Sequence, residues 1–238
     1  MARIILIHGA WGNAKTWARL VPLLEACGHQ VEALDLPGHG SSSVPPETVR
    51  QSSYVSHVSE RLLDGPPAVL VGHSMGGIVV AQTAGLHPRH VKTCVFVAAL
   101  LPRDGESLLN LVRQQDTAGL QSAVRPGPAP GTSVLDPDIA GAIMCQDAPH
   151  DVAVKAMTAL SPQSNTAQKD PAVIGPGFAG VPRAYVFCAQ DLVVTPALQR
   201  QMVAATPCEA EFTLESGHVP QLTQGKALAE IINGIART

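Results

Sequence analysis

A serine flanked by glycines is the residue whose setting in this sequence most clearly indicates chemistry. Ser74 lies at the centre of Gly72-His73-Ser74-Met75-Gly76. The apolar run Ala68–Val71 before it predicts a strand, and the residues after it have a helical pattern. A tight strand-to-helix turn strains its central serine and exposes the hydroxyl at the end of the strand. The setting therefore predicts a nucleophile rather than a serine that only caps a helix.

Such a serine needs a general base, normally a histidine, because its hydroxyl is a weak nucleophile. The chain contains nine histidines. His218 comes after the apolar run Ala210–Leu214 and before the last helical pattern, so we expect it at the same sheet edge as Ser74. His8 and His73 also lie at strand ends, but each is confined to a glycine-flanked turn. We therefore predict that His218 is the base.

The carboxylate that orients this base should follow another strand. Asp191 comes shortly after the apolar run Ala184–Cys188, again at the carboxyl end of an expected strand. Asp104 and Asp35 are the alternatives, although Asp35 adjoins a Pro-Gly turn that it is suited to fix. We predict Asp191, which gives the chain order serine, aspartate, histidine that is expected of a strand–turn–helix nucleophile.

An oxyanion hole is expected at the end of the first strand. The run Ile4–Ile7 leads into His8-Gly9-Ala10-Trp11-Gly12, a glycine-flanked turn whose N–H groups can point inward. We predict that the N–H groups of Ala10 and Met75 stabilise the oxyanion. Trp11 is expected to wall the substrate pocket, and burial as a packing residue is the alternative.

Apolar runs alternate with helical patterns along most of the chain, which predicts a parallel sheet covered by helices on both faces. The expected strands are Ile4–Ile7, Val31–Leu34, Ala68–Val71, Cys94–Ala98, Ala184–Cys188 and Ala210–Leu214. The expected helices are Ala14–Cys27, Val49–Leu63, Ser74–Leu86, Pro196–Ala205 and Gln221–Ile235.

One long stretch interrupts this alternation. Residues 102–182 show no convincing strand, only helical patterns joined by Pro- and Gly-rich links. The helical patterns are Glu106–Val124, Pro137–Cys145 and His150–Leu160. We interpret the stretch as a helical lid inserted into a single core formed by residues 1–101 and 183–238, since long loops in compact domains are usually functional. An insertion without function is the alternative.

Taken together, these residues resemble the α/β-hydrolase superfamily, and within it the compact branch of plant methylesterases, hydroxynitrile lyases and bacterial esterases. The matching stretches are Ile7-His8-Gly9-Ala10-Trp11, Leu20 to His29, Leu34-Asp35-Leu36, Gly72 to Gly77, and Gln190-Asp191 with Thr195-Pro196. The resemblance implies an α/β-hydrolase fold with a six-stranded, mainly parallel sheet and a lid after the fourth strand. It also implies a carboxylesterase that cleaves a small or medium hydrophobic ester through an acyl-enzyme.

Two departures bear on the reaction. The lyases that the chain resembles carry a lysine directly after the catalytic histidine and a threonine near the oxyanion turn, where this chain has Val219 and Ala10. Cyanide release, which needs a nearby positive charge, is therefore a secondary alternative. A ligand receptor on the same fold is another. The serine at position 74 argues against haloalkane dehalogenases, which have an aspartate nucleophile there.

Composition limits the partners. Hydrophobic residues make up 45% of 238 residues and the net charge is −3 with no charge blocks, so we expect a sizeable core and no nucleic acid or membrane partner. No histidine spacing suits a metal and no dinucleotide fingerprint is present, so no cofactor is expected. Unpaired cysteines and an N-terminal apolar run of only four residues favour a cytoplasmic protein. The sequence leaves the oligomeric state open.

Overall fold

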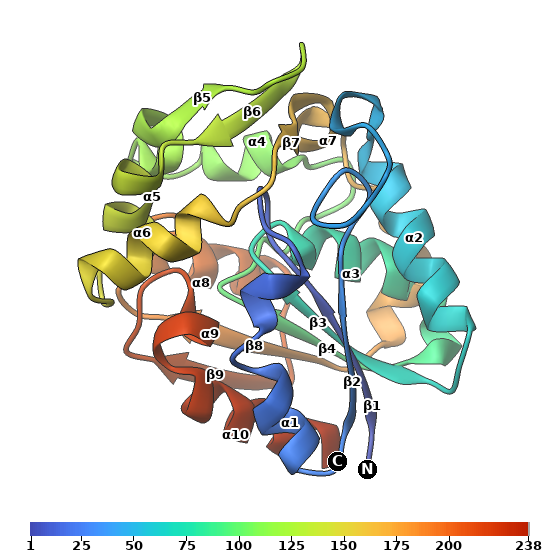
Figure 1. Ribbon diagram of the computed structural model, residues 1–238. Coiled ribbons are helices and arrows are strands. Elements are labelled where there is room, and N and C mark those ends of the chain that lie inside the picture. Colours follow the sequence, from blue (N-terminus) through green and yellow to red (C-terminus); the bar gives the residue numbers. More distant parts are fainter. Residues whose placement is uncertain (238) are drawn as a thin grey trace.

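A computed structural model describes residues 1–237. Its centre is a six-stranded sheet with the order β2-β1-β3-β4-β8-β9, in which every neighbouring pair is parallel (Figure 1). The strands are β1 (Arg3–Ile7), β2 (Gln30–Leu34), β3 (Ala68–His73), β4 (Val91–Val97), β8 (Arg183–Cys188) and β9 (Ala210–Leu214). The predicted six-stranded sheet and fold class are thereby confirmed.

The alternation of side chains along β1 explains why the sheet is covered on both faces. Ile5 and Ile7 belong to one buried cluster with residues of α2 (Gln51–Leu63), α3 (Gly76–Leu86) and α8 (Pro196–Ala205). Ile4 and Leu6 belong to a second cluster with residues of α1 (Val21–Ala26) and α10 (Gly225–Arg237). Each strand residue points to the opposite face from its neighbour, so a continuous apolar run suits a sheet between two helical layers.

Two of the expected helices are broken. Ala14–Cys27 is not one helix but a 3-10 turn at Ala14–Trp17 followed by α1, because Pro22 lacks the N–H that would continue the helix. Gln221–Ile235 is likewise divided into α9 (Pro220–Thr223) and α10, since Gln224 leaves helical geometry before Gly225. The prediction Pro196–Ala205 agrees with α8 at both ends.

The chain between β4 and β8 differs most from expectation. It contains α4 (Leu108–Val112), α5 (Pro137–Met144), α6 (His150–Thr158) and α7 (Asn165–Lys169). It also forms a small antiparallel sheet of β5 (Val124–Pro126), β6 (Thr132–Leu135) and β7 (Gln163–Ser164).

The expectation of a purely helical lid was therefore wrong. The Pro/Gly-rich link is the loop of the β5–β6 hairpin, where the Gly127 N–H donates to the Thr132 carbonyl and Gly131 has a φ of 79°. The predicted helix Glu106–Val124 also ends early, at Val112. Strands of two to four residues are too short to show an alternating pattern.

In Figure 1 these elements lie over one end of the main sheet. We refer to residues 102–182 as the lid. No helix within residues 1–237 combines the length and the apolar character that crossing a bilayer requires.

Candidate active site

Ser74 lies in the turn between β3 and α3, where its φ is 54°. This left-handed conformation is unfavourable for a side chain other than glycine. Glycines make the turn possible: a Cβ on Gly72 would lie 2.7 Å from the Gly76 carbonyl, and one on Gly76 would lie 2.5 Å from the Ile7 carbonyl. The tight approach leaves Ser74 partly exposed among buried neighbours. Its hydroxyl is therefore presented where a substrate could reach it.

His218 and Asp191 form a buried pair. His218 Nδ1 lies 2.8 Å from Asp191 Oδ2, and each residue is only 1% exposed. A carboxylate only accepts, so the histidine donates through Nδ1–H and keeps a lone pair on Nε2. The other carboxylate oxygen accepts from the N–H groups of Val193 and Val194 at 2.7 and 3.0 Å. These main-chain donors fix the orientation of the carboxylate and, through it, of the imidazole ring.

The other carboxylates considered for this role lie elsewhere. Asp35 accepts from the Ala14 N–H at 2.7 Å and from the Ser41 N–H and hydroxyl, so it ties loops together. Asp104 accepts from the Ile174 N–H at 2.8 Å. Neither shares a hydrogen bond with His218.

Ser74 and His218 line the same cavity, which has a volume of about 830 Å³. Within residues 1–237 no hydrogen bond connects the serine hydroxyl to the imidazole ring. Such bonds are often long or misaligned without substrate and tighten when it binds. The structure thus brings the three predicted residues to one site, with the His218–Asp191 contact already formed.

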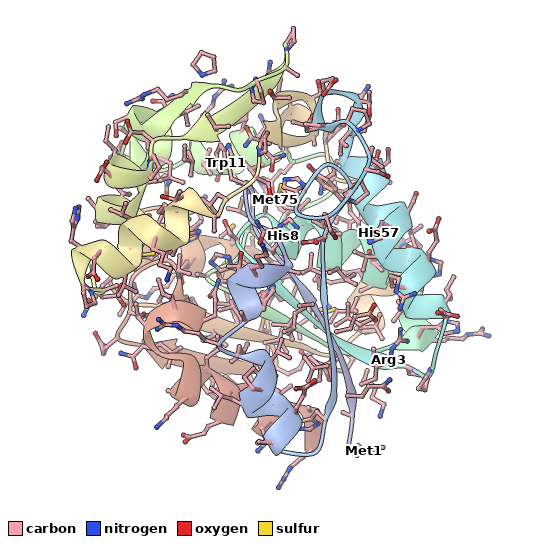
Figure 2. The ribbon with its side chains drawn as sticks, viewed as in Figure 1. Met1, Arg3, His8, Trp11, His57 and Met75 are labelled. Carbon is pink, nitrogen blue, oxygen red and sulfur yellow. The ribbon has the colours of Figure 1, made fainter. Side chains whose placement is uncertain are left out.

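The predicted oxyanion turn adjoins the nucleophile. A Cβ on Gly9 would lie 2.8 Å from the Ser74 Cβ, so the two turns are in van der Waals contact. Neither the Ala10 N–H nor the Met75 N–H donates to another group of the described chain, which leaves both free for a ligand. Figure 2 shows His8, Trp11 and Met75 gathered beneath the lid, whereas Met1 and Arg3 lie at the opposite end of the molecule.

His8 fixes the peptide that carries the Ala10 N–H. Burial lowers the pKa of His8 to about 3, so the ring is neutral. Its Nδ1–H donates to the Gly9 carbonyl at 2.8 Å, and its Nε2 accepts from the Leu36 N–H at 3.2 Å. The Gly9 carbonyl and the Ala10 N–H belong to one planar trans peptide, so holding the first aims the second in the opposite direction.

His73 is a residue whose role the sequence did not reveal. Its Nε2–H donates to the main-chain carbonyl of His218 at 2.7 Å, and burial lowers the pKa of His73 to about 3. A neutral His73 therefore fastens the loop of His218 to the nucleophile turn. The sequence feature that could have indicated this role is the position of His73, which lies directly before Ser74 at the end of a strand. Gln199, which donates to Asp191 Oδ2 at 3.2 Å, was also missed.

Trp11 is buried in the core cluster, with 8% of its surface exposed, and it also lines the cavity. It therefore has the features of both alternatives, and its contact with substrate stays a prediction. The rest of the cavity wall comes mostly from the lid and mixes aliphatic residues with polar ones such as Arg19, Arg113 and Gln168. The aliphatic residues of the lid include Leu108, Val112, Met144, Met157 and Leu160. No set of three or more His, Cys, Asp or Glu side chains among residues 1–237 is arranged to hold a metal ion.

Several known proteins are similar to this chain over almost its whole length. Putative methylesterase 13 of Arabidopsis thaliana, a chloroplastic protein, is 26% identical over 249 residues, which cover 99% of this chain and 56% of that protein. Methylesterase 2 of the same plant is 27% identical, covering 98% and 95%. A crystal structure of a pyrethroid hydrolase from Sphingobium faniae JZ-2 has a TM-score of 0.86 at 26% identity, covering 100% and 98%.

The chain spans 56% and 63% of the lengths of the first two curated relatives that it matches. The model of the alpha/beta hydrolase family matches residues 4–231, almost the whole chain. On this match, the protein belongs to the alpha/beta hydrolase family.

Proposed function

We propose that this protein is a carboxylic-ester hydrolase that cleaves a small or medium hydrophobic ester through an acyl-enzyme on Ser74. The observation that carries the proposal is the meeting of a strained, accessible serine with the buried His218–Asp191 pair at one cavity. The names of similar proteins, methylesterases and a pyrethroid hydrolase, support the same class of reaction.

In the first half of the reaction, the Ser74 hydroxyl attacks the ester carbonyl. His218 Nε2 takes the hydroxyl proton, and Asp191 stabilises the resulting imidazolium. The carbonyl oxygen becomes an oxyanion, and the N–H groups of Ala10 and Met75 donate to it. Collapse of this intermediate expels the alcohol, which receives its proton from His218, and leaves an ester on the serine.

In the second half, water replaces the alcohol. His218 removes a proton from the water, which attacks the acyl carbonyl through a second oxyanion held by the same two N–H groups. Ser74 leaves with the proton from His218, and the free acid is released. No cofactor takes part in either half of the proposed reaction.

The lid, residues 102–182, is proposed to select the substrate. Its leucine, valine and methionine side chains line the same cavity as Ser74 and His218, and such side chains favour an aliphatic or otherwise hydrophobic ester. Esters that differ in acyl and alcohol size, including methyl esters and pyrethroid-like esters, are the panel that measures this preference. No observation favours the lyase alternative, since buried Val219 offers no positive charge beside His218.

The proposal is tested by hydrolysis of p-nitrophenyl butyrate with wild-type protein and Ser74→Ala. Replacing the serine of a triad should lower kcat about 10⁴–10⁶-fold, because removal of one member abolishes the concerted step. Labelling with a fluorophosphonate followed by peptide mapping should modify Ser74 in the wild type. Hydrolysis that survives in Ser74→Ala, or thermal stabilisation by esters without turnover, would contradict the proposal, and the second result would indicate a receptor.

A further inference from the structure

The segment that follows β4 bends beside the nucleophile turn. Ala98 has a φ of 44°, a left-handed conformation that alanine rarely adopts. Before the bend, the Val97 carbonyl accepts from the Ser74 N–H at 3.3 Å, and after it the Leu100 N–H donates to the Ser74 carbonyl at 3.0 Å. The bend thus holds both main-chain polar groups of the nucleophile. A strained conformation persists only where its surroundings impose it, so other residues must hold the bend.

The hydroxyl of Tyr185 is one group that holds this bend. Tyr185 lies in β8, the strand next to β4, and its hydroxyl is 2.6 Å from the Ala99 carbonyl oxygen. A carbonyl can only accept, so the hydroxyl donates. Burial holds the pKa of Tyr185 well above its usual value of 10, so the hydroxyl keeps its proton. Both residues are fully buried, which leaves no water to replace this donor.

Two peptide groups connect this hydroxyl to the Met75 N–H. The Ala99 carbonyl and the Leu100 N–H belong to one of them, and the Ser74 carbonyl and the Met75 N–H belong to the other. No peptide bond within residues 1–237 is cis, so in each group the C=O and the N–H point in opposite directions. The Tyr185 hydroxyl fixes the first group and thereby aims the Leu100 N–H at the Ser74 carbonyl. That bond in turn sets the direction of the Met75 N–H.

The Ser74 carbonyl has a second donor, which differs from Leu100 in where it comes from. The Gly77 N–H donates to this carbonyl at 3.0 Å, but Gly77 belongs to the nucleophile turn itself and moves with it. Leu100 is the donor from outside the turn. The bend also packs directly on the turn, since a Cβ on Gly77 would lie 2.5 Å from the Leu100 carbonyl and 2.8 Å from the Ala99 Cβ. The bend therefore anchors the turn to the rest of the sheet.

We propose that Tyr185 is a positioning residue for the oxyanion hole, a role that rests on the ester hydrolysis proposed above. It supports the Met75 N–H from behind, as His8 supports the Ala10 N–H. Without the hydroxyl, the buried Ala99 carbonyl lacks this donor, its peptide group can rotate, and the Met75 N–H is less firmly aimed at the oxyanion. Such a loss weakens the transition state more than bound substrate, so it lowers kcat and leaves KM nearly unchanged.

The test compares Tyr185→Phe with Tyr54→Phe in the hydrolysis of p-nitrophenyl butyrate. Titration with a fluorophosphonate counts the active sites, so that kcat refers to folded protein. In Tyr185→Phe kcat should fall about tenfold, less than the roughly 10²–10³ of a lost donor because the Met75 N–H stays in the turn, with KM within about twofold. Tyr54, the other tyrosine of the chain, is equally buried, and its hydroxyl accepts from the Gln163 amide at 3.1 Å. Its replacement should leave kcat unchanged.

A butyl trifluoromethyl ketone separates oxyanion stabilisation from general loosening of the protein. Ser74 Oγ adds to its carbonyl carbon, the serine proton passes to His218, and the carbonyl oxygen becomes the anion of a hemiketal. The inhibition constant should rise about tenfold in Tyr185→Phe, in step with the fall in kcat, because this adduct and the transition state need the same donors. The matching methyl ketone, which is too weak an electrophile to form the adduct, should bind equally to variant and wild type.

Equal kcat values for Tyr185→Phe and wild type would overturn the role, as would a loss shared by Tyr54→Phe or confined to KM. Should Tyr185→Phe not fold, the α-hydroxy analogue of leucine at position 100 tests the same connection. It keeps the side chain, replaces the donating N–H by an oxygen and weakens the Ala99 carbonyl as an acceptor. A lower kcat with this analogue supports the role, and an unchanged kcat overturns it. Absence of hydrolysis by the wild type would overturn the proposed function itself, a result distinct from active but unaffected variants.

Discussion

The carboxylate of Asp191 has four donors around it, and only one of them is His218. The N–H groups of Val193 and Val194 bind one oxygen, while Gln199 and His218 bind the other. The main chain can keep the side chain in place even when its chemistry changes. A substitution of Asp191 can therefore change how His218 is oriented without unfolding the protein.

Asp191→Asn should remain folded and lose activity. The amide oxygen can still accept from Val193 and Val194, which turns the amide NH₂ toward His218 Nδ1. The ring must then carry its proton on Nε2, where it can no longer accept the serine proton. We expect kcat to fall about 10⁴-fold, measured with p-nitrophenyl butyrate.

Asp104→Asn is the control, because Asp104 follows β4 as Asp191 follows β8, and within residues 1–237 its hydrogen bond is to the Ile174 N–H of the lid. Its kcat should stay close to that of the wild type. A large loss in Asp104→Asn together with an active Asp191→Asn would reverse the assignment of the carboxylate.

At the scale of elements, the contact between β1 and the start of α3 sets the position of the nucleophile. The Gly76 Cα faces the Ile7 carbonyl so closely that an added Cβ would lie 2.5 Å from the oxygen. Gly76→Ala must therefore push α3 away from β1. We expect the free energy of unfolding to fall by about 1–3 kcal/mol, measured by urea denaturation, with a loss of activity as Ser74 moves.

Gly234→Ala provides the matched control for this prediction. Gly234 lies in α10, where no atom approaches within 4 Å of an added Cβ and where alanine favours helix. The substitution should raise stability by about 0.5–1 kcal/mol. Equal changes in the free energy of unfolding for the two alanine variants would contradict the prediction. They would mean that the close approach of α3 to β1 does not require glycine at position 76.

The elements that the sequence allowed us to predict are those with a local signal. The fully buried run Ile4–Ile7 and the Thr195-Pro196 helix start each contain their own evidence within a few residues. β7 consists of two residues and pairs with β6, whose partner residues lie about thirty positions earlier in the chain. Its existence depends on tertiary contacts, so no local pattern could reveal it.

The same reason explains which site residues could be predicted. Ser74, Asp191 and His218 each follow a recognisable strand, and parallel strands bring their carboxyl ends to one edge. The hydrogen bonds of Gln163 join Trp11, His39 and Tyr54, which are far apart in sequence and share no motif. The reactive residues at the strand ends could therefore be predicted from the sequence, whereas the hydrogen bonds that lid residues make to the site could not.

At the scale of the whole molecule, buried neutral histidines link stability to pH. Burial lowers the pKa of both His8 and His73 to about 3, from the usual 6.5. Between pH 6.5 and pH 3 the unfolded chain therefore binds protons at these residues that the folded protein does not. The contribution of these two histidines to the free energy of unfolding is fully present above pH 6.5. It declines as the pH falls, by up to about 1.4 kcal/mol per pH unit for each histidine.

Replacing one of these histidines should reduce that pH dependence. His73→Asn removes one titrating group, so the free energy of unfolding between pH 6 and pH 5 should change less steeply than in the wild type, by about 1 kcal/mol per unit. Urea unfolding at several pH values measures both proteins. A wild-type stability that is flat over this range would contradict the prediction, because it would require His8 and His73 to accept protons in the folded state, with His73 still joined to His218.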